Sequence, residues 1–166
     1  GSEWTPLPPT VTECREPVVL AIGLFDGIGG PRRSLERLRL RVALNVSVEK
    51  DPRAARLVRE AWPGTIEMDD IHNVTRGFLA AIICTAVELG VRMVILVGGW
   101  PCQDVSQLNR NRVGVSRARS GLFREFIRVA TEAREVAHGR DLLFLGVGEC
   151  TVMDAADEAE ITRECG

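Results

Sequence analysis

Cys102 is the residue of this chain best placed to act as a nucleophile. It follows an apolar, β-branched run at 93–97, two glycines, Trp100 and Pro101. Such a run predicts a buried strand, and Pro101 predicts an extended turn after it, because proline keeps the preceding residue out of the helical region. Ligands bind at the carboxyl ends of strands in open parallel sheets. Cys102 is therefore a candidate nucleophile at a ligand-binding edge, although a lone cysteine is more often a small buried apolar residue.

A glycine-rich turn followed by an acidic residue predicts a site for a nucleoside-bearing cofactor. Residues 18–22 predict a buried strand, and Gly23-Leu24-Phe25-Asp26-Gly27-Ile28-Gly29-Gly30 follows it. Glycines let the backbone approach a ligand, and the helix expected to begin near Pro31 offers its amino-terminal amides. Glu49 ends the next predicted strand, 42–48, where a carboxylate can accept hydrogen bonds from a ribose diol.

Two further acidic residues follow predicted strands. Asp70 comes after a short strand at 65–68, and Glu149 comes after a fifth strand at 142–147. Both are therefore expected at the same sheet edge as Cys102.

Helical spacing of apolar residues separates these strands. Asp51-Pro52 has the pattern of an N-cap followed by proline, and Pro63-Gly64 ends that helix. Strands that alternate with helices predict an α/β fold, with a mostly parallel sheet and helices on both faces. The apolar positions are Leu35 and Leu38 in the first helix, Ala54, Ala55, Val58, Ala61 and Trp62 in the second, Val74, Phe78, Ala81, Ile82, Thr85, Ala86 and Leu89 in the third, and Leu122, Phe126, Val129, Ala133 and Val136 in the fourth.

Composition limits the class of protein. The chain has 166 residues, 45% hydrophobic and 27% charged, which is typical of one globular domain and excludes disorder. No apolar run approaches the roughly 20 residues of a membrane span. Five irregularly spaced cysteines do not form a disulfide framework, which favours a reducing, intracellular setting. With two histidines and no clustered ligands, no metal site is expected. The formal charge of -2 means that any nucleic-acid surface is local.

Residues 1–17 are rich in proline and predict an extended lead-in, with Gly1-Ser2 typical of a cloning remnant. The domain itself is expected at 18–166.

The polar stretch from Gln103 to Arg119 is a candidate phosphate-binding loop. Charge runs are usually solvated faces, but arginines directly after a nucleophile suit contact with a nucleic-acid backbone. Ser106 and Asn109 could add hydrogen bonds, and the arginines are Arg110, Arg112, Arg117 and Arg119.

Taken together, these motifs resemble those of the cytosine-5 DNA methyltransferases. The order and spacing of Phe25-Asp26-Gly27-Ile28-Gly29-Gly30, Glu49, Asp70, Pro101-Cys102 and Glu149 carry the resemblance. It is closest to the eukaryotic de novo branch, through Leu24 to Ile28, Ser47 to Asp51, Ser120 to Arg128 and Asp157 to Arg163. The resemblance runs from about Arg15 to Cys165 and covers the amino-terminal part of the family's catalytic domain. It implies a truncated, Rossmann-like fold of S-adenosylmethionine-dependent methyltransferases.

The resemblance implies S-adenosylmethionine as cofactor and S-adenosylhomocysteine as product. Phe25 would stack near the adenine, Glu49 would bind the ribose hydroxyls, and Asp70 would accept from the adenine amino group. Ile71 would pack on the ring, Pro101 would line the pocket, and Asp26 with the backbone of Gly27, Ile28 and Gly29 would face the methionine part.

The implied chemistry makes Cys102 the nucleophile. C5 of cytosine is a poor nucleophile, so a thiolate first adds to C6 of a base flipped out of DNA. Glu149, kept protonated by burial, would donate toward N3. Methyl transfer to C5, loss of the C5 proton and expulsion of Cys102 complete the cycle.

The chain departs from the family pattern in three places. Cys150 stands where the family has an asparagine that braces the Pro-Cys loop, and a thiol is a weaker hydrogen-bonding group. Arg124 stands where the de novo enzymes have an aromatic of their subunit interface. The base-contacting arginine motif, the recognition region and the last cofactor motif do not occur in this sequence. Either the sequence is a fragment, or a second chain completes it in a homo- or hetero-oligomer.

Three alternatives remain open. The chain could be a non-catalytic regulatory or partner subunit, or act on tRNA. A nicotinamide-binding Rossmann domain is weakened by the absence of a full GxGxxG motif. An intracellular location is expected, nuclear and epigenetic in role if the source is eukaryotic, with no membrane partner.

Overall fold

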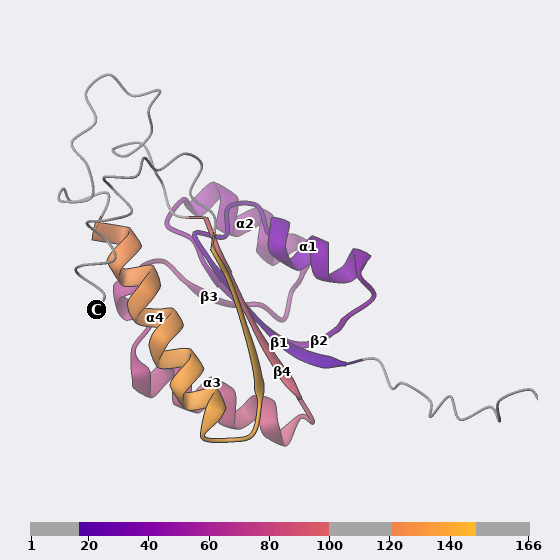
Figure 1. Cartoon of the computed structure of the whole chain (residues 1–166). Coiled ribbons are helices and arrows are strands. Elements are labelled where there is room, and N and C mark those ends of the chain that lie inside the picture. Colours follow the sequence, from indigo (N-terminus) through magenta and orange to yellow (C-terminus); the bar gives the residue numbers. More distant parts are fainter. Residues whose placement is uncertain (1–16, 100–120, 149–166) are drawn as a thin grey trace, which may run out of the picture.

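The computed structural model describes residues 17–99 and 121–148, which form five strands and four α-helices (Figure 1). β1 begins at Val18. The strands are β1 (Val18–Leu24), β2 (Arg41–Val48), β3 (Ile66–Met68), β4 (Met93–Gly98) and β5 (Leu143–Gly148). The helices are α1 (Gly30–Arg37), α2 (Pro52–Ala61), α3 (Arg76–Glu88) and α4 (Gly121–His138), with a short 3₁₀ turn, η1 (Ile71–Asn73), before α3.

The strands form one parallel sheet in the order β3-β2-β1-β4-β5, which confirms the α/β prediction. β1 is the central strand, so the chain reverses its direction of winding between β3 and β4. Figure 1 shows α1 and α2 on one side of the sheet and α3 and α4 on the other. In such sheets the switch point beside the central strand is the usual place for a ligand.

Both faces of β1 are buried, because successive side chains alternate between the two helical layers. Leu20 and Ile22 belong to the main core with Leu79 and Ile83 of α3. A smaller core on the opposite face contains Val19, Ala21 and Ile95 of the sheet and Leu35 of α1. This is why β1 and β4 show continuous apolar runs rather than alternation.

Three helical faces differ in part from the predicted ones. In α2, Ala61 is exposed and Val58 is the buried side chain. Leu38 is 69% exposed because α1 ends at Arg37 and Leu38 is its C-cap. In α3 the buried side chains are Leu79, Ile83 and Ala86, whereas three predicted members of the stripe, Ala81, Thr85 and Leu89, are exposed. Val74, also predicted in that stripe, is buried but precedes the helix, which starts after the Thr75 N-cap. α3 is apolar nearly all round, so its sequence period could not identify the face that packs.

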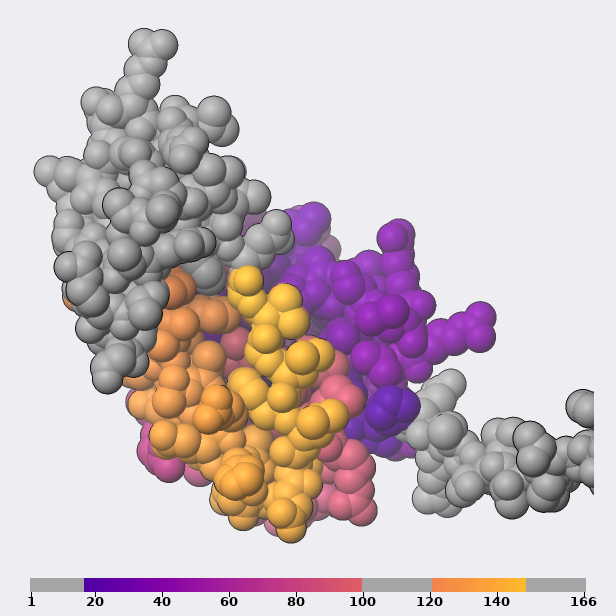
Figure 2. Space-filling view, viewed as in Figure 1, coloured from indigo at the N-terminus to yellow at the C-terminus, as the bar shows by residue number. Residues whose placement is uncertain are grey.

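β5 lies at the edge of the described sheet and exposes apolar side chains. Leu143, Leu145 and Val147 are 61%, 48% and 47% exposed. Their register partners on β4 are Met93, Ile95 and Val97, which pack in the smaller core. Figure 2 shows β5, in yellow, lying open at the surface. In the described part of the chain, the apolar edge strand β5 is therefore incompletely covered.

None of the helices in the described ranges has the length and apolarity to span a membrane.

Candidate cofactor site

A pocket of about 340 Å³ lies at the carboxyl ends of β1, β2 and β3. It brings together four of the residues predicted to bind the cofactor, although they come from three different strand ends. The residues that line it are Phe25, Val48, Glu49, Lys50, Asp69, Asp70, Ile71, His72, Gly99 and Leu122.

The turn after β1 reverses within very few residues. Phe25, Gly27 and Gly29 have φ values of 54°, 57° and 82°, all in the left-handed region. For a bulky residue such as Phe25 this conformation is strained, and such strain is commonly found at ligand sites. The turn thereby places the Phe25 side chain in the lining of the pocket rather than in the sheet.

Glu49 connects three segments through its carboxylate. Its Oε2 accepts from the backbone N–H of Gly27 at 2.7 Å, and its Oε1 accepts from the N–H of Asp51 at 2.8 Å. Asp51 in turn caps α2 by accepting from the N–H of Arg53 at 2.9 Å. Because an ionised carboxylate offers about four acceptor sites, Glu49 keeps capacity for a diol while holding the glycine turn.

Asp26 lies beneath the turn and not among the residues that line the pocket. Only 6% of the residue is exposed, and its Oδ2 accepts from the hydroxyl of Ser47 on β2 at 2.6 Å. Burial raises the pKa of Asp26, the Ser47 hydrogen bond opposes that rise, and the nearby Glu49 carboxylate adds to it. Gly23 makes room for this side chain, since a Cβ there would overlap the Asp26 carboxylate.

Asp70 caps η1 and faces the same pocket. Its Oδ1 accepts from the backbone N–H of His72 at 2.9 Å and from the His72 ring Nδ1 at 2.6 Å. The backbone hydrogen bond from His72 is the main cause that lowers the pKa of Asp70, and the ring contact adds to it. Ile71, between them, is 3% exposed and joins the pocket to the main core.

Arg128 of α4 fixes the backbone of this turn from the opposite side. Its guanidinium donates to the carbonyl oxygens of Ile71 at 3.2 Å and Val74 at 2.9 Å. Glu125 and Glu132 hold the same guanidinium at 2.7 and 3.1 Å. The sequence analysis missed Arg128. The only available signal was an arginine with acidic residues three before and four after it on a helix.

The glycine turn is supported from α2 by Trp62. A Cβ at Gly29 would overlap the Trp62 ring, so both the ring and the left-handed φ require glycine there. The indole N–H of Trp62 donates to Glu36 of α1 at 2.7 Å, and the Arg33 guanidinium lies 5.1 Å from the ring centroid. Ile28, at the tip of the turn, is 69% exposed. Gly27, Ile28 and Gly29 thus lie beside the pocket without lining it.

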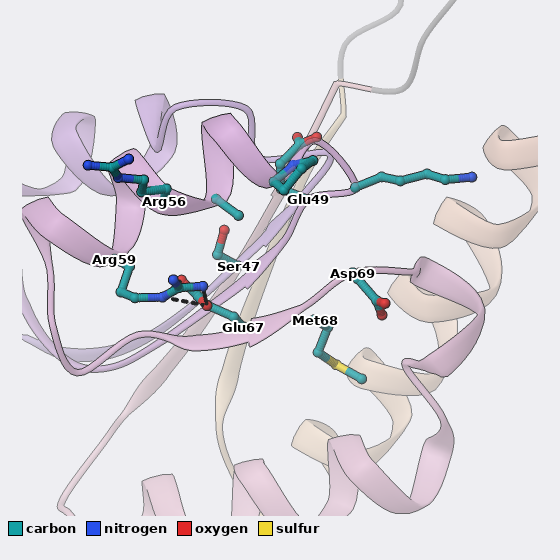
Figure 3. A pocket seen from close by; sticks show the side chains of 10 residues that line it. Ser47, Glu49, Arg56, Arg59, Glu67, Met68 and Asp69 are labelled. Carbon is teal, nitrogen blue, oxygen red and sulfur yellow. Dashed lines mark hydrogen bonds and ion pairs between the residues drawn. The ribbon is translucent and has the colours of Figure 1, made fainter.

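A second, wider pocket of about 560 Å³ lies between α2 and β3 and shares Glu49, Lys50 and Asp69 with the first. Figure 3 shows Arg59 and Glu67 pointing toward one another across it, and their ion pair measures 2.6 Å. This ion pair uses the charged groups of both residues, so the second pocket offers no free guanidinium at that point.

The predicted catalytic and DNA-contacting residues lie outside the described part of the chain, but the strands that lead to them are described. Gly98 at the end of β4 pairs in register with Gly148 at the end of β5. The segments that lead to Cys102 and to Glu149 therefore begin side by side at the edge that carries the pocket. A side chain at Gly98 would overlap Phe126 of α4, which explains that glycine. The predicted site residues that lie outside the described ranges are Pro101, Cys102, Ser106, Asn109, Arg110, Arg112, Arg117, Arg119 and Glu149.

The described residues contain no group of three or more side chains that could hold a metal ion.

Sequence comparison relates the chain to methyltransferases. It is 30% identical over 125 residues to the DNA (cytosine-5)-methyltransferase DRM2 of Arabidopsis thaliana, which covers 71% of this chain and 19% of that protein. It is 34% identical over 114 residues to the type II methyltransferase M.AquIA of Picosynechococcus, which covers 68% and 43%. The chain thus spans about a fifth of the plant relative and less than half of the bacterial one.

Solved structures share the fold. A structure described as a DNA modification methyltransferase encoded within a prophage (E. coli) superposes with a TM-score of 0.58 at 22% identity, over 89% of this chain and 36% of that one. The Dnmt2 methyltransferase of S. pombe superposes with a TM-score of 0.53 at 16% identity, over 90% and 41%. The described sheet and helices therefore have the methyltransferase architecture.

The family model of the C-5 cytosine-specific DNA methylases matches residues 20–135, which include the glycine turn, Glu49, Asp70 and the segment after β4. The chain belongs to the C-5 cytosine-specific DNA methylase family.

Proposed function

We propose that this chain is the cofactor-binding and nucleophile-bearing part of a DNA (cytosine-5)-methyltransferase that uses S-adenosylmethionine. The observation that carries the proposal is the pocket formed by Phe25, Glu49, Asp70 and Ile71 at successive strand ends. Family membership supports methyl transfer to C5 of cytosine as the reaction that such a pocket would serve.

The side chains in the pocket fit an adenosyl group. Phe25 and Ile71 offer apolar surface for a purine ring, and Glu49 keeps acceptor capacity for the two ribose hydroxyls. Asp70 has one carboxylate oxygen with no donor among the described residues, which suits an amino group. The surrounding carboxylates also favour a cationic ligand. When bound, S-adenosylmethionine supplies the electrophilic methyl group.

Cys102 and Glu149 carry the chemistry in this proposal. The Cys102 thiolate adds to C6 of the flipped cytosine, and the electron pair displaced from the C5–C6 double bond moves toward N3. Glu149 donates a proton there, which leaves C5 electron-rich. After methylation, a base removes the C5 proton, the C6–Sγ bond breaks to release the Cys102 thiolate, and the N3 proton returns to Glu149. The paired ends of β4 and β5, at Gly98 and Gly148, support this arrangement.

DNA is the proposed nucleic-acid substrate. Arg110, Arg112, Arg117 and Arg119 would contact phosphates near the flipped base, with Ser106 and Asn109 adding hydrogen bonds. In a eukaryotic source this substrate would place the protein in the nucleus, with an epigenetic role. A tRNA substrate is the nearest alternative, and competition between duplex DNA and tRNA for the same chain distinguishes the two.

The exposed apolar side chains of β5 are a candidate contact surface for a further part of the enzyme. The apolar side chains of Leu143, Leu145 and Val147 form a contiguous exposed stripe. A stripe of this kind commonly marks a surface that another part of the protein or a partner covers. We propose that the target-recognition region, in the same polypeptide or in a second chain, covers them. Co-purification of a second chain that protects β5 amides from hydrogen exchange tests this point.

A non-catalytic partner subunit is the second candidate function. Cys150, in place of the family's asparagine, is the feature that favours it. Such a subunit would keep the fold and the adenosyl pocket but would not form a covalent bond with cytosine.

Two measurements test the proposal. Calorimetric titration with S-adenosylhomocysteine should show binding by the wild-type chain and its loss in Glu49→Ala. A duplex containing 5-fluorocytosine should then be trapped covalently with S-adenosylmethionine present, because fluorine at C5 cannot leave as the proton does. Cys102→Ser is the control and should give no adduct. Cofactor binding without trapping would favour the partner subunit, and a folded chain that binds no cofactor would contradict the adenosyl site.

A further inference from the structure

His72 directs two donors at one oxygen of Asp70. The backbone N–H and the ring Nδ1 of His72 both meet Oδ1, at 2.9 and 2.6 Å. No hydrogen bond from the described residues reaches Oδ2. The two side chains are partly open to solvent, and both line the 340 Å³ pocket.

We propose that His72 is a positioning residue that orients the Asp70 carboxylate so that its free oxygen selects a purine with a 6-amino group. The inference rests on the proposed adenosyl site. It assigns a specificity role to a residue that is not itself expected to touch the reacting atoms.

The orientation matters because a carboxylate that rotates freely offers no fixed acceptor. A single backbone donor to Oδ1 leaves rotation about the Cβ–Cγ bond open. The second donor, on a side chain two residues away, restricts that rotation and leaves Oδ2 as the acceptor for a ligand. An amino group at purine C6 donates to this oxygen, whereas a 6-oxo group presents a second acceptor and is repelled.

The rest of the turn is held well enough for this restriction to persist. Arg128 of α4 fixes the carbonyls of Ile71 and Val74, on either side of His72. Asn73 donates to the neighbouring Asp69 at 3.4 Å. The other charged groups in the pocket lining are Glu49, Lys50 and Asp69, and none of them has a hydrogen bond to Asp70 among the described residues.

The arrangement also fixes the tautomer of the His72 ring. A carboxylate oxygen accepts only from a protonated nitrogen, so the neutral ring carries its hydrogen on Nδ1 and leaves Nε2 as an acceptor.

The test compares S-adenosylhomocysteine with S-inosylhomocysteine, which differs in having a 6-oxo group. Calorimetry on the whole chain gives the ratio of the two dissociation constants. The wild type should prefer the adenosyl ligand, and His72→Ala should reduce that preference roughly tenfold or more. His72→Asn should restore most of it, because the asparagine amide can donate to the same oxygen. Nitrogen-15 shifts of the His72 ring should show the Nδ1–H tautomer.

A wild-type preference that His72→Ala leaves unchanged would overturn the inference while the adenosyl site stands. An Nε2–H tautomer of His72 in the free protein would also overturn it. If the folded wild-type chain binds neither ligand, the proposed function itself fails, and circular dichroism separates that outcome from misfolding.

Discussion

The backbone N–H of Gly27 donates to Oε2 of Glu49 over 2.7 Å, so the side chain that ends β2 holds the turn that follows β1. The other oxygen, Oε1, holds the N–H of Asp51 at the start of α2. A residue expected to bind ribose is therefore also part of the frame of its own pocket. Loss of its charge should disturb both roles together.

Glu49→Gln should weaken binding of S-adenosylhomocysteine about tenfold and lower the free energy of unfolding by about 1 kcal/mol. The amide nitrogen of glutamine cannot accept a hydrogen bond, so either Gly27 or Asp51 loses its partner. Calorimetry and urea denaturation measure the two effects. Glu60→Gln is the control, because Glu60 is exposed on α2 and pairs with Arg56. Equal affinities for wild type and Glu49→Gln would contradict the role assigned to Glu49.

Gly29→Ala should lower the free energy of unfolding by about 3 kcal/mol, whereas Gly27→Ala should cost about 1 kcal/mol. Both positions have a left-handed φ, but only at Gly29 would the new methyl group meet Trp62. Urea denaturation of the two variants separates backbone strain from overlap. In a Trp62→Leu background, part of the Gly29→Ala cost should disappear, and equal costs in both backgrounds would count against the proposed overlap.

Asp26→Asn should gain stability relative to wild type as the pH rises. The pKa of Asp26 is raised by burial above its ordinary value of 3.8, so the folded state binds its proton more tightly than the unfolded state. The wild type therefore loses stability as the pH rises from that ordinary value through the raised one, and the asparagine variant does not. The asparagine oxygen can still accept from Ser47. Urea denaturation from about pH 4 to about pH 8 checks this, and a difference independent of pH would disprove it.

Arg128→Met should speed hydrogen exchange at residues 71–75 and weaken S-adenosylhomocysteine binding. The substitution removes the donors to the Ile71 and Val74 carbonyls, and we expect a loss of about 2 kcal/mol in unfolding free energy. Arg134→Met is the matched control, since Arg134 lies exposed on the same helix. If both variants exchange alike at η1, Arg128 does not hold that turn.

The strand ends were predictable because apolar, β-branched runs mark buried strands and parallel topology brings their carboxyl ends to one edge. The order of the strands placed Glu49 and Asp70 at one sheet edge, whereas Phe25 and Ile71 were assigned to the cofactor only through the family resemblance. The structure brings all four into the lining of one pocket. The N-cap of α2 at Asp51 was equally predictable, since an acidic residue before proline is a local signal.

Residues that act across the fold could not be predicted in this way. Arg128 donates to the backbone carbonyl of Val74, which lies 54 positions earlier in the chain. Every residue has a backbone carbonyl, so no residue type in the sequence marks this acceptor. The role of His72 depends on which oxygen of Asp70 it meets, which is a matter of rotamers. The position of Asp26 was also unpredictable, because the same motif is compatible with a side chain above or below the turn.

The central position of β1 has a consequence for biosynthesis. β1 (Val18–Leu24) can pair early with β2, the next strand to be synthesised. Its other neighbour in the sheet is β4, where Val19 lies opposite Met93, and β4 is synthesised much later. A nascent chain must therefore keep one side of its most apolar strand unpaired while α2, β3 and α3 are synthesised. Such long-range parallel pairing is slow and exposed to aggregation. Because Leu122 of α4 also lines the cofactor pocket, that pocket can be completed only after β4 and the start of α4 have been synthesised.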